Sequence, residues 1–194
     1  MIHELLKSHK LILASASPRR KEIFGLMGLK PLVVKSGIVE PIDTRHPRFI
    51  VQSHALHKAL AVIDKFDSEA VIIGCDTLVS IDGAVLGKPM NKPEAVEYLR
   101  MLSGKTHAVY SGICILFRNS RYVSYERSLV RFTKMTDPEI EAYADTNEPY
   151  DKAGGYGIQG LGCQFIKGIT GCYFNVMGFP VHLFYKMLNE ILAD

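Results

Sequence analysis

Charged residues whose types suit phosphate chemistry follow a short apolar segment near the start of the chain. Arg19 and Arg20 come directly after Ser17-Pro18, a typical helix start, and residues 11–14 indicate a buried strand. Cations in the first turn of a helix are disfavoured by roughly 0.3–1 kcal/mol each. Together with the serine, which would cap the free N–H groups, they could bind one phosphate or carboxylate. The alternative is that one or both arginines reach solvent or pair with a distant acid.

Two acids and a further lysine also fall at the ends of predicted elements. Asp76 follows the buried strand predicted over residues 70–73, where a catalytic or metal-binding carboxylate would be held rigidly, although a turn or helix cap is the alternative. Glu40 is a candidate ligand or a solvated loop acid. Lys88, between a glycine and a proline, could be aimed at a ligand, but surface exposure is the commoner fate of lysine.

Cations gathered with acids indicate a polyphosphate and a divalent metal ion. Carboxylates bind a hard ion such as Mg²⁺ through oxygen, and the cations balance the phosphate charge. The residues by themselves therefore predict phosphate-ester or nucleotide chemistry.

The remaining polar candidates carry weaker signals. Lys58 lies on a predicted helix, where its stem could follow apolar surface. His54, His57 and His107 are candidate bases, but no serine or cysteine stands near them in a recognised nucleophile context, so we expect surface or capping roles. Asp151-Lys152 could form a structural ion pair.

Composition excludes several classes of protein. The 194 residues are 47% hydrophobic and 22% charged, which suits one sizeable domain or two small lobes. A net charge of +3 without a dense Lys/Arg block argues against nucleic-acid binding, and no apolar run reaches the ~18 residues of a membrane helix. No signal peptide is evident, so we expect a cytoplasmic protein. Four scattered cysteines without metal spacing predict buried thiols in a reducing compartment.

Two glycine motifs match known patterns only superficially. Residues 155–160 read GxGxxG, but they precede a predicted strand instead of following one, which argues against a dinucleotide site. Residues 104–106 read GKT, but Leu99 occupies the position where a phosphate-binding loop needs glycine.

Strands and helices alternate along the chain, which predicts an α/β domain with two lobes around a cleft. After the strand at 11–14 and the helix that begins at Ser17-Pro18, the predicted elements are a strand at 32–35, a loop at 37–44, a helix at 47–65, a strand at 70–73, a hairpin at 78–86 turned at Asp82-Gly83, a helix at 93–102, strands at 107–117 and 122–132, a helix at 137–145 capped by Thr136 or Asp137, a strand at 163–166 and a helix at 175–192.

Eight segments together resemble the Maf family of nucleoside triphosphate pyrophosphatases, in order and spacing as well as content. They are LASASPRR, VE at 39–40, ALHKALAV, IGCDTLV, LGKPMNKPEA, LSGKTHAVYSG, EPYDKAGGYGIQGLG and NVMGFP. The resemblance covers nearly the whole chain and is weakest over residues 43–53.

The resemblance implies a fold like that of inosine triphosphate pyrophosphatases: an elongated mixed sheet with flanking helices, and one domain over residues 1–194 with two lobes around a cleft. It implies hydrolysis between the α and β phosphates with a divalent cation, Mg²⁺ or alternatively Mn²⁺ or Co²⁺. We also expect a homodimer. The DKAGGYGIQG segment resembles the group that acts on dTTP and UTP; the group that acts on 7-methyl-GTP typically has glutamate at position 159.

The family's functional residues fall on positions that match its motifs. Asp76 falls on the proposed catalytic base, and Glu40 and Lys88 on the charged set around metal and phosphates, with Glu40 and Asp76 as metal ligands. Ser17, Arg20 and Lys58 fall on phosphate-binding positions. Arg19, Thr77 and Gln159 fall on positions associated with substrate choice, and the Gln159 amide suits a pyrimidine edge because it offers both a donor and an acceptor.

A second function of another class stays open. The family has also been linked to septum arrest, so the chain could be a nucleotide-binding regulator of cell division with little turnover. The acids Glu40 and Asp76 favour the enzyme, because a protein that only binds nucleotide does not need a base.

Overall fold

The computed structural model describes residues 1–42 and 45–192 and divides them into two compact units. Unit 1 comprises Met1–Asp76, Ser111–Glu126 and Gly178–Asp194, and unit 2 comprises Thr77–Tyr110 and Arg127–Met177. The interpretation of these units as lobes of one domain around a cleft stays a prediction.

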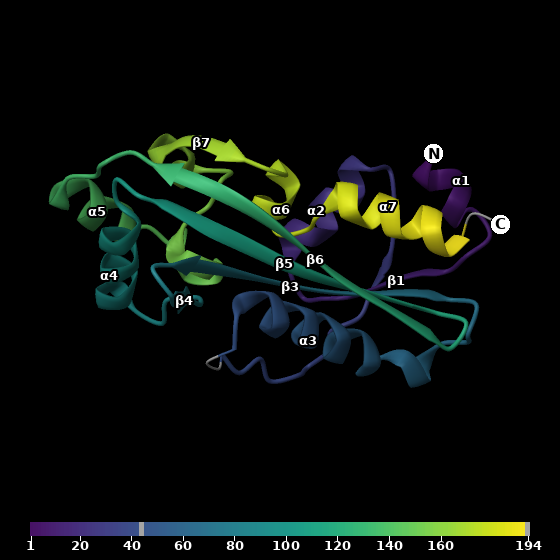
Figure 1. Cartoon of the computed structure of the whole chain (residues 1–194). Helices are drawn as coiled ribbons and strands as arrows, with labels where there is room; N and C mark the ends of the chain where they lie inside the picture. The colour runs from purple at the N-terminus through teal and green to yellow at the C-terminus, as the bar shows by residue number, and fades with distance from the viewer. Residues whose placement is uncertain (43–44, 193–194) are drawn as a thin grey trace. The chain divides into compact units, whose positions relative to one another are not determined.

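The strands form a mixed sheet in the order β2-β1-β3-β5-β6-β7, with β4 paired to β3 beside this path. Strand β1 is parallel to β2 and β3, whereas β4 is antiparallel to β3 and β7 is antiparallel to β6. Helices flank the sheet (Figure 1), and the predicted mixed α/β class is confirmed. The strands are β1 (Leu11–Ala14), β2 (Leu32–Val33), β3 (Val71–Ile81), β4 (Ala84–Leu86), β5 (Thr106–Phe117), β6 (Ser120–Phe132) and β7 (Ile166–Thr170).

In unit 1, helix α3 (Pro47–Leu60) packs directly on the backbone of the sheet. A Cβ on Gly74 of β3 would overlap the Ala55 carbonyl of this helix, and one on Gly112 of β5 would overlap the Val51 carbonyl. Because side chains alternate along a strand, Ile72 and Asp76 leave β3 on the same face as Gly74, and Ile72 shares a core with Ala55. Residues two positions apart on β3 therefore face α3.

Other helices of unit 1 cover the opposite face of its strands (Figure 1). The Phe24 ring of α2 (Pro18–Leu26) lies 4.8 Å from the Phe179 ring and 5.7 Å from the Phe184 ring of α7 (Val181–Leu192). Helix α1 (Ile2–Leu6) also contacts α7. The predicted single helix over 175–192 is wrong: α6 (Tyr173–Met177) ends before Gly178, whose φ is 121°, and Pro180 precedes α7.

Unit 2 is built around α4 (Lys92–Leu102) and α5 (Asp137–Ala144), which contact one another. Thr136 caps α5 through its hydroxyl while Glu139 bonds back to the Thr136 N–H, which confirms one of the two predicted caps. The core of this unit includes Leu99, Phe132 and Phe165.

The hairpin turn predicted at Asp82-Gly83 is present, and a turn of the same kind joins β5 to β6. The turn between β3 and β4 lies at Asp82 and Gly83, with φ of 49° and 85°, and the turn between β5 and β6 lies at Arg118 and Asn119, with φ of 46° and 63°. Positive φ at both central residues matches the right-handed twist of the strands.

Several predicted boundaries differ from the structure. The helix predicted over 47–65 ends at Leu60 and is followed by the 3₁₀ turn η1 (Ile63–Lys65). The strand predicted at 163–166 is wrong, because Leu161–Phe165 is the 3₁₀ helix η4 and β7 begins only at Ile166. The predicted loop is present over 37–42, and residues 43–44 lie outside the described part of the chain.

All four cysteines are free thiols, but only Cys75 and Cys114 are buried; Cys163 is exposed, contrary to prediction, and Cys172 is half-buried. Within residues 1–42 and 45–192, no helix combines the length and apolar character needed to cross a bilayer.

Candidate active site

Asp76 meets two side chains that leave α3 one helical turn apart. His54 and Lys58 occupy i and i+4 positions, so they share the face of the helix that lies over β3. His54 Nδ1 lies 2.9 Å from Asp76 Oδ2, and Lys58 Nζ lies 2.7 Å from Asp76 Oδ1. All three residues are buried. The packing of α3 on β3 therefore places the Asp76 carboxylate between the side chains of His54 and Lys58.

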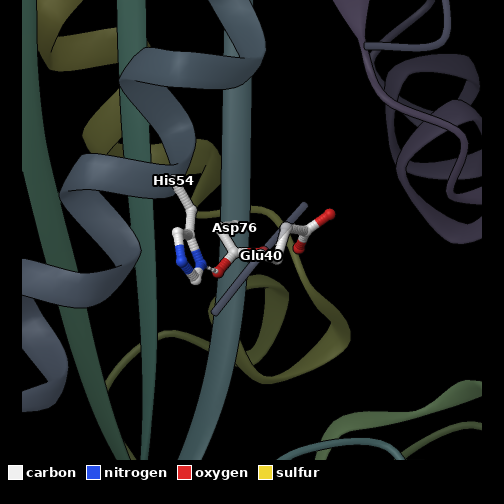
Figure 2. A group of neighbouring side chains, drawn as sticks. All are labelled: Glu40, His54 and Asp76. Carbon is white, nitrogen blue, oxygen red and sulfur yellow. Dashed lines mark hydrogen bonds and ion pairs between the residues drawn. The ribbon is translucent and has the colours of Figure 1, made fainter. Parts of the chain in front are cut away.

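Glu40 adds a second carboxylate on the solvent side of this cluster. Its Oε2 accepts a hydrogen bond from Lys58 Nζ at 2.7 Å, so the lysine bridges the two acids. The Glu40 side chain is 43% exposed, against 7% for those of Lys58 and Asp76. Figure 2 shows the His54 ring directed at Asp76, with Glu40 on the neighbouring coil. The site is open to solvent at Glu40 and closed at Asp76.

The hydrogen bonds of His54 define its charge. Nε2 lies 3.0 Å from the Pro41 carbonyl, which can only accept, and Nδ1 faces the Asp76 carboxylate. Both ring nitrogens therefore donate, and His54 is an imidazolium. The hydrogen bond to Asp76 raises the pKa of His54, burial opposes this rise, and the charges of Asp76 and Glu40 add to it.

Asp76 is a carboxylate despite its burial. Burial alone would raise its pKa, but the hydrogen bond from His54 and the charges of Lys58 and Arg20 hold the pKa of Asp76 well below its usual range. Asp76 therefore stays ionised near neutral pH.

The donor set at this cluster fits a divalent cation. Ligand atoms of Glu40, His54 and Asp76 all lie within 4.8 Å of one another, and carboxylate oxygens are the ligands that hard ions prefer. Both His54 nitrogens are already engaged, so His54 acts as a partner that orients Asp76 and not as a metal ligand itself.

Arg20 is held in the interior beside Asp76. Its Nε donates to the Gly178 carbonyl at 2.9 Å and its Nη1 donates to Ser15 Oγ at 3.1 Å. Ser15 Oγ also accepts from the Ser17 N–H at 3.2 Å. The Ser17 side chain occupies the N-cap position of α2 without a capping hydrogen bond to the described residues, so the predicted serine cap is wrong. The first turn of α2 contains no acid, and Arg19 there is half-buried.

Three predicted site residues belong to unit 2. Thr77 follows Asp76 on β3 and is half-buried. Lys88 is exposed on the segment between β4 and α4, and the Gly87 carbonyl beside it accepts a hydrogen bond from the Gly154 N–H at 2.8 Å. Gln159 is half-buried in the loop between the 3₁₀ turns η3 (Ala153–Gly155) and η4. In unit 2, the segment of Lys88 therefore adjoins the start of the glycine-rich stretch that carries Gln159.

The prediction of a surface or capping role is wrong for two of the three histidines. His54 is buried at the site, and His107 is buried with its Nε2 2.7 Å from the Tyr156 hydroxyl. His57 is exposed. The spacing of His54 and Lys58 was the signal for a shared role, because residues four apart on a helix lie on one face. The predicted Asp151–Lys152 ion pair is present at 2.5 Å.

The chain is thus a mixed α/β protein in which a buried carboxylate, Asp76, contacts the cationic side chains of His54 and Lys58. The family model described as "Maf-like protein" matches residues 10–191, and the chain belongs to the Maf-like family.

Relatives extend this assignment along nearly the whole chain. A protein of Bacillus anthracis (strain CDC 684 / NRRL 3495) named "dTTP/UTP pyrophosphatase" is 44% identical over 186 residues, which cover 95% of this chain and 97% of the relative. Proteins of the same name from Bacillus cereus strains AH820 and AH187 are 44% and 43% identical over the same length.

Proposed function

We propose that this protein is a nucleoside triphosphate pyrophosphatase that hydrolyses dTTP and UTP to the nucleoside monophosphate and pyrophosphate. The names of its relatives support this activity. The observation that carries the proposal is the cluster in which Lys58 bridges Asp76 and Glu40 while His54 orients Asp76. Two carboxylates that could bind a metal ion and activate water thus lie beside Lys58, a cation that could bind phosphate.

In the proposed reaction, Asp76 orients a water molecule and accepts its proton as the water oxygen attacks the α-phosphorus. The bond from this phosphorus to the oxygen that bridges to the β-phosphorus breaks, and pyrophosphate leaves with the electron pair. Because the pKa of Asp76 is depressed, it is a weak base while Lys58 and His54 both donate to it. A substrate phosphate that attracts Lys58 would raise the basicity of Asp76 as the reaction begins.

The remaining residues bind and select the nucleotide in this proposal. Ser17, Arg20 and Lys58 bind phosphate oxygens, and Lys88 neutralises charge on the leaving pyrophosphate. Arg19, Thr77 and Gln159 choose the substrate, with the Gln159 amide reading a pyrimidine edge.

A divalent ion completes the site. Glu40 and Asp76 would hold it, and it would stabilise negative charge on the phosphates; Mg²⁺ is proposed, with Mn²⁺ or Co²⁺ as alternatives. We also propose, from the resemblance to the Maf family, that the enzyme works as a homodimer in the cytoplasm and cleans the nucleotide pool.

The test is pyrophosphate release from dTTP, UTP, CTP, GTP and 7-methyl-GTP with Mg²⁺. Wild type should turn over dTTP and UTP, and Asp76→Asn should lose this by on the order of 10²–10⁴-fold because the amide cannot accept the proton. Asp64→Asn, at an exposed acid of η1, is the matched control and should retain wild-type rates. Nucleotide binding by the wild type without turnover would overturn the proposal and favour the regulatory alternative.

A further inference from the structure

Glu148 is a half-buried carboxylate of unit 2 that binds the backbone of the glycine-rich loop. Its Oε2 accepts a hydrogen bond from the Leu161 N–H at 2.8 Å, and its Oε1 accepts from the Gly162 N–H at 2.9 Å. The Tyr143 hydroxyl also donates to Oε1, at 2.8 Å. These contacts use both carboxylate oxygens for a segment that is 13 and 14 residues further along the chain.

Tyr143 extends this contact to the other side of Gln159. The same hydroxyl that donates to Glu148 accepts a hydrogen bond from the Gly157 N–H at 3.2 Å. Glu148 and Tyr143 together, named here the loop clamp, therefore hold the backbone two residues before Gln159 and two and three residues after it.

The charge state of the clamp suits this role. Burial would raise the pKa of Glu148, but the two backbone N–H groups and the Tyr143 hydroxyl outweigh burial and hold the pKa below its usual value. Burial and the hydrogen bond to Glu148 raise the pKa of Tyr143. Near neutral pH, Glu148 is therefore a carboxylate that accepts and Tyr143 is a phenol that donates.

Three glycines of the loop approach the clamp closely, and at Gly157 and Gly162 an added Cβ would also meet loop backbone, at 2.7 Å from the Gln159 carbonyl and 2.6 Å from the Gly157 carbonyl. A Cβ on Gly157 would lie 2.8 Å from Glu148 Oε1, and one on Gly160 would lie 2.6 Å from Glu148 Oε2. A Cβ on Gly162 would lie 2.7 Å from the Tyr143 hydroxyl, and Gly160 also has φ of 95°. Gly157 and Gly160 of the GxGxxG pattern thus let the backbone approach an internal carboxylate, in place of the phosphate of a dinucleotide.

We propose that Glu148 is a positioning residue that, through the loop clamp, sets the conformation in which Gln159 faces the nucleotide and thereby controls base selectivity. The proposal rests on the proposed function of Gln159 as a substrate-choosing residue. Without the Glu148 carboxylate, the N–H groups of Leu161 and Gly162 lose their acceptor, and the loop can move to find another. Gln159 would then be presented in several orientations, and discrimination between bases would fall.

The test compares Glu148→Gln with wild type in steady-state hydrolysis of dTTP, UTP, CTP and GTP. The glutamine keeps the shape but exchanges one acceptor oxygen for a donor, so one loop N–H is left unsatisfied. We expect the ratio of kcat/KM for dTTP to that for CTP to fall about tenfold, mainly through KM. Glu139→Gln removes an equal charge at the start of α5 and should leave this ratio unchanged. A wild-type ratio in Glu148→Gln would overturn the proposal.

A second variant tests the proposal even if Glu148→Gln does not fold. Tyr143→Phe keeps the Glu148 carboxylate but removes the hydroxyl that joins it to Gly157, so the same ratio should fall by a smaller factor of about threefold. If Glu148→Gln does not fold, the Tyr143→Phe ratio decides the outcome, and an unchanged value contradicts the clamp.

A measurement on the protein without nucleotide separates the clamp from the proposed function. Amide hydrogen exchange at Leu161 and Gly162 should become faster in Glu148→Gln and stay at the wild-type rate in Glu139→Gln. If wild type hydrolysed no nucleotide, the proposed function would fail, but the exchange rates and the ratio of the dTTP and GTP dissociation constants would still test the clamp. Unchanged exchange rates in Glu148→Gln would overturn it.

Discussion

His54 on α3 donates a hydrogen bond from Nδ1 to the Asp76 carboxylate of β3 across 2.9 Å. Its other nitrogen donates to the carbonyl of Pro41, the residue after Glu40. The His54 ring therefore holds both Asp76 and the loop segment that carries Glu40, the second acid. The arrangement requires an imidazolium, because neither acceptor has a proton to give.

The first prediction concerns the titration of His54. In wild type, the ring should titrate above 6.5, its ordinary pKa, because the hydrogen bond to Asp76 outweighs burial. The stability that this contact provides is present below pH 6.5 and is lost as pH rises through the higher folded pKa. In Asp76→Asn, the pKa of His54 should fall, because burial remains and the main partner is gone.

NMR titration of the imidazole Cε1–H resonance checks this prediction, and a His54→Gln variant assigns the resonance. The same His54 pKa in wild type and Asp76→Asn would mean that the contact with Asp76 does not hold the proton.

The second prediction concerns Lys58, which neutralises two carboxylates from a buried position. Lys58→Met leaves Asp76 and Glu40 facing each other without their shared cation. We expect the free energy of unfolding to fall by about 3 kcal/mol in metal-free buffer, as when one partner of a buried ion pair is removed. Adding Mg²⁺ should restore part of the loss, because bound metal stabilises the folded state.

Urea unfolding with and without Mg²⁺ provides the measurement. Lys105→Met removes a lysine whose partner, Asp82, is an exposed acid, so it should cost less than about 1 kcal/mol and respond to Mg²⁺ only as wild type does. A Mg²⁺ response of Lys58→Met no larger than that of Lys105→Met would mean that the metal does not compensate for the lost lysine between Glu40 and Asp76.

Local patterns predicted most of the fold because short-range physics decides those elements. The Asp82-Gly83 turn follows from turn residues between two apolar runs, and Thr136 caps α5 through a bond within one turn. The error at 163–166 has a long-range cause: the N–H groups of Leu161 and Gly162 go to Glu148, which no local pattern indicates.

The candidate site divides in the same way. Asp76 was predicted as a site residue, but its predicted place after a strand at 70–73 is wrong, because β3 continues from Val71 to Ile81 and Asp76 lies within it. The partner of that carboxylate could not be predicted, because His54 is 22 residues away in sequence and its role depends on α3 packing against Gly74. The role of Ser15 was missed because the helix-start pattern drew attention to Ser17. In the structure, it is the Ser15 hydroxyl that accepts a hydrogen bond from Arg20.

The third prediction concerns His107, whose burial lowers its pKa to about 4. The folded state therefore prefers neutral His107, whereas the unfolded chain binds a proton near pH 6.5. Stability should fall as pH drops from about 6.5 to about 4, with a slope of up to ~1.4 kcal/mol per pH unit from this residue. His54 contributes in the opposite sense, since its pKa is raised.

Chemical unfolding of wild type and His107→Gln at a series of pH values isolates the contribution of His107 to the pH dependence of stability. The difference between their unfolding free energies should change over pH 4–6.5 and be constant above about pH 7.5. A constant difference throughout this series would show that His107 is not buried in its neutral form.

The last prediction links the packing of α3 to the site. A Cβ at Gly74 would overlap the Ala55 carbonyl, so Gly74→Ala must push away the helix that carries His54 and Lys58. We expect a loss of about 2–3 kcal/mol in the free energy of unfolding, typical of overpacking, together with a loss of turnover larger than that of other variants with equal stability. Gly25→Ala is the matched control: this α2 position has no atom within 4 Å of an added Cβ, so the change should stabilise the protein by up to about 1 kcal/mol. Thermal unfolding and dTTP turnover of both variants provide the comparison. Full turnover in a destabilised Gly74→Ala would mean that the contacts of His54 and Lys58 with Asp76 do not depend on how closely α3 approaches β3.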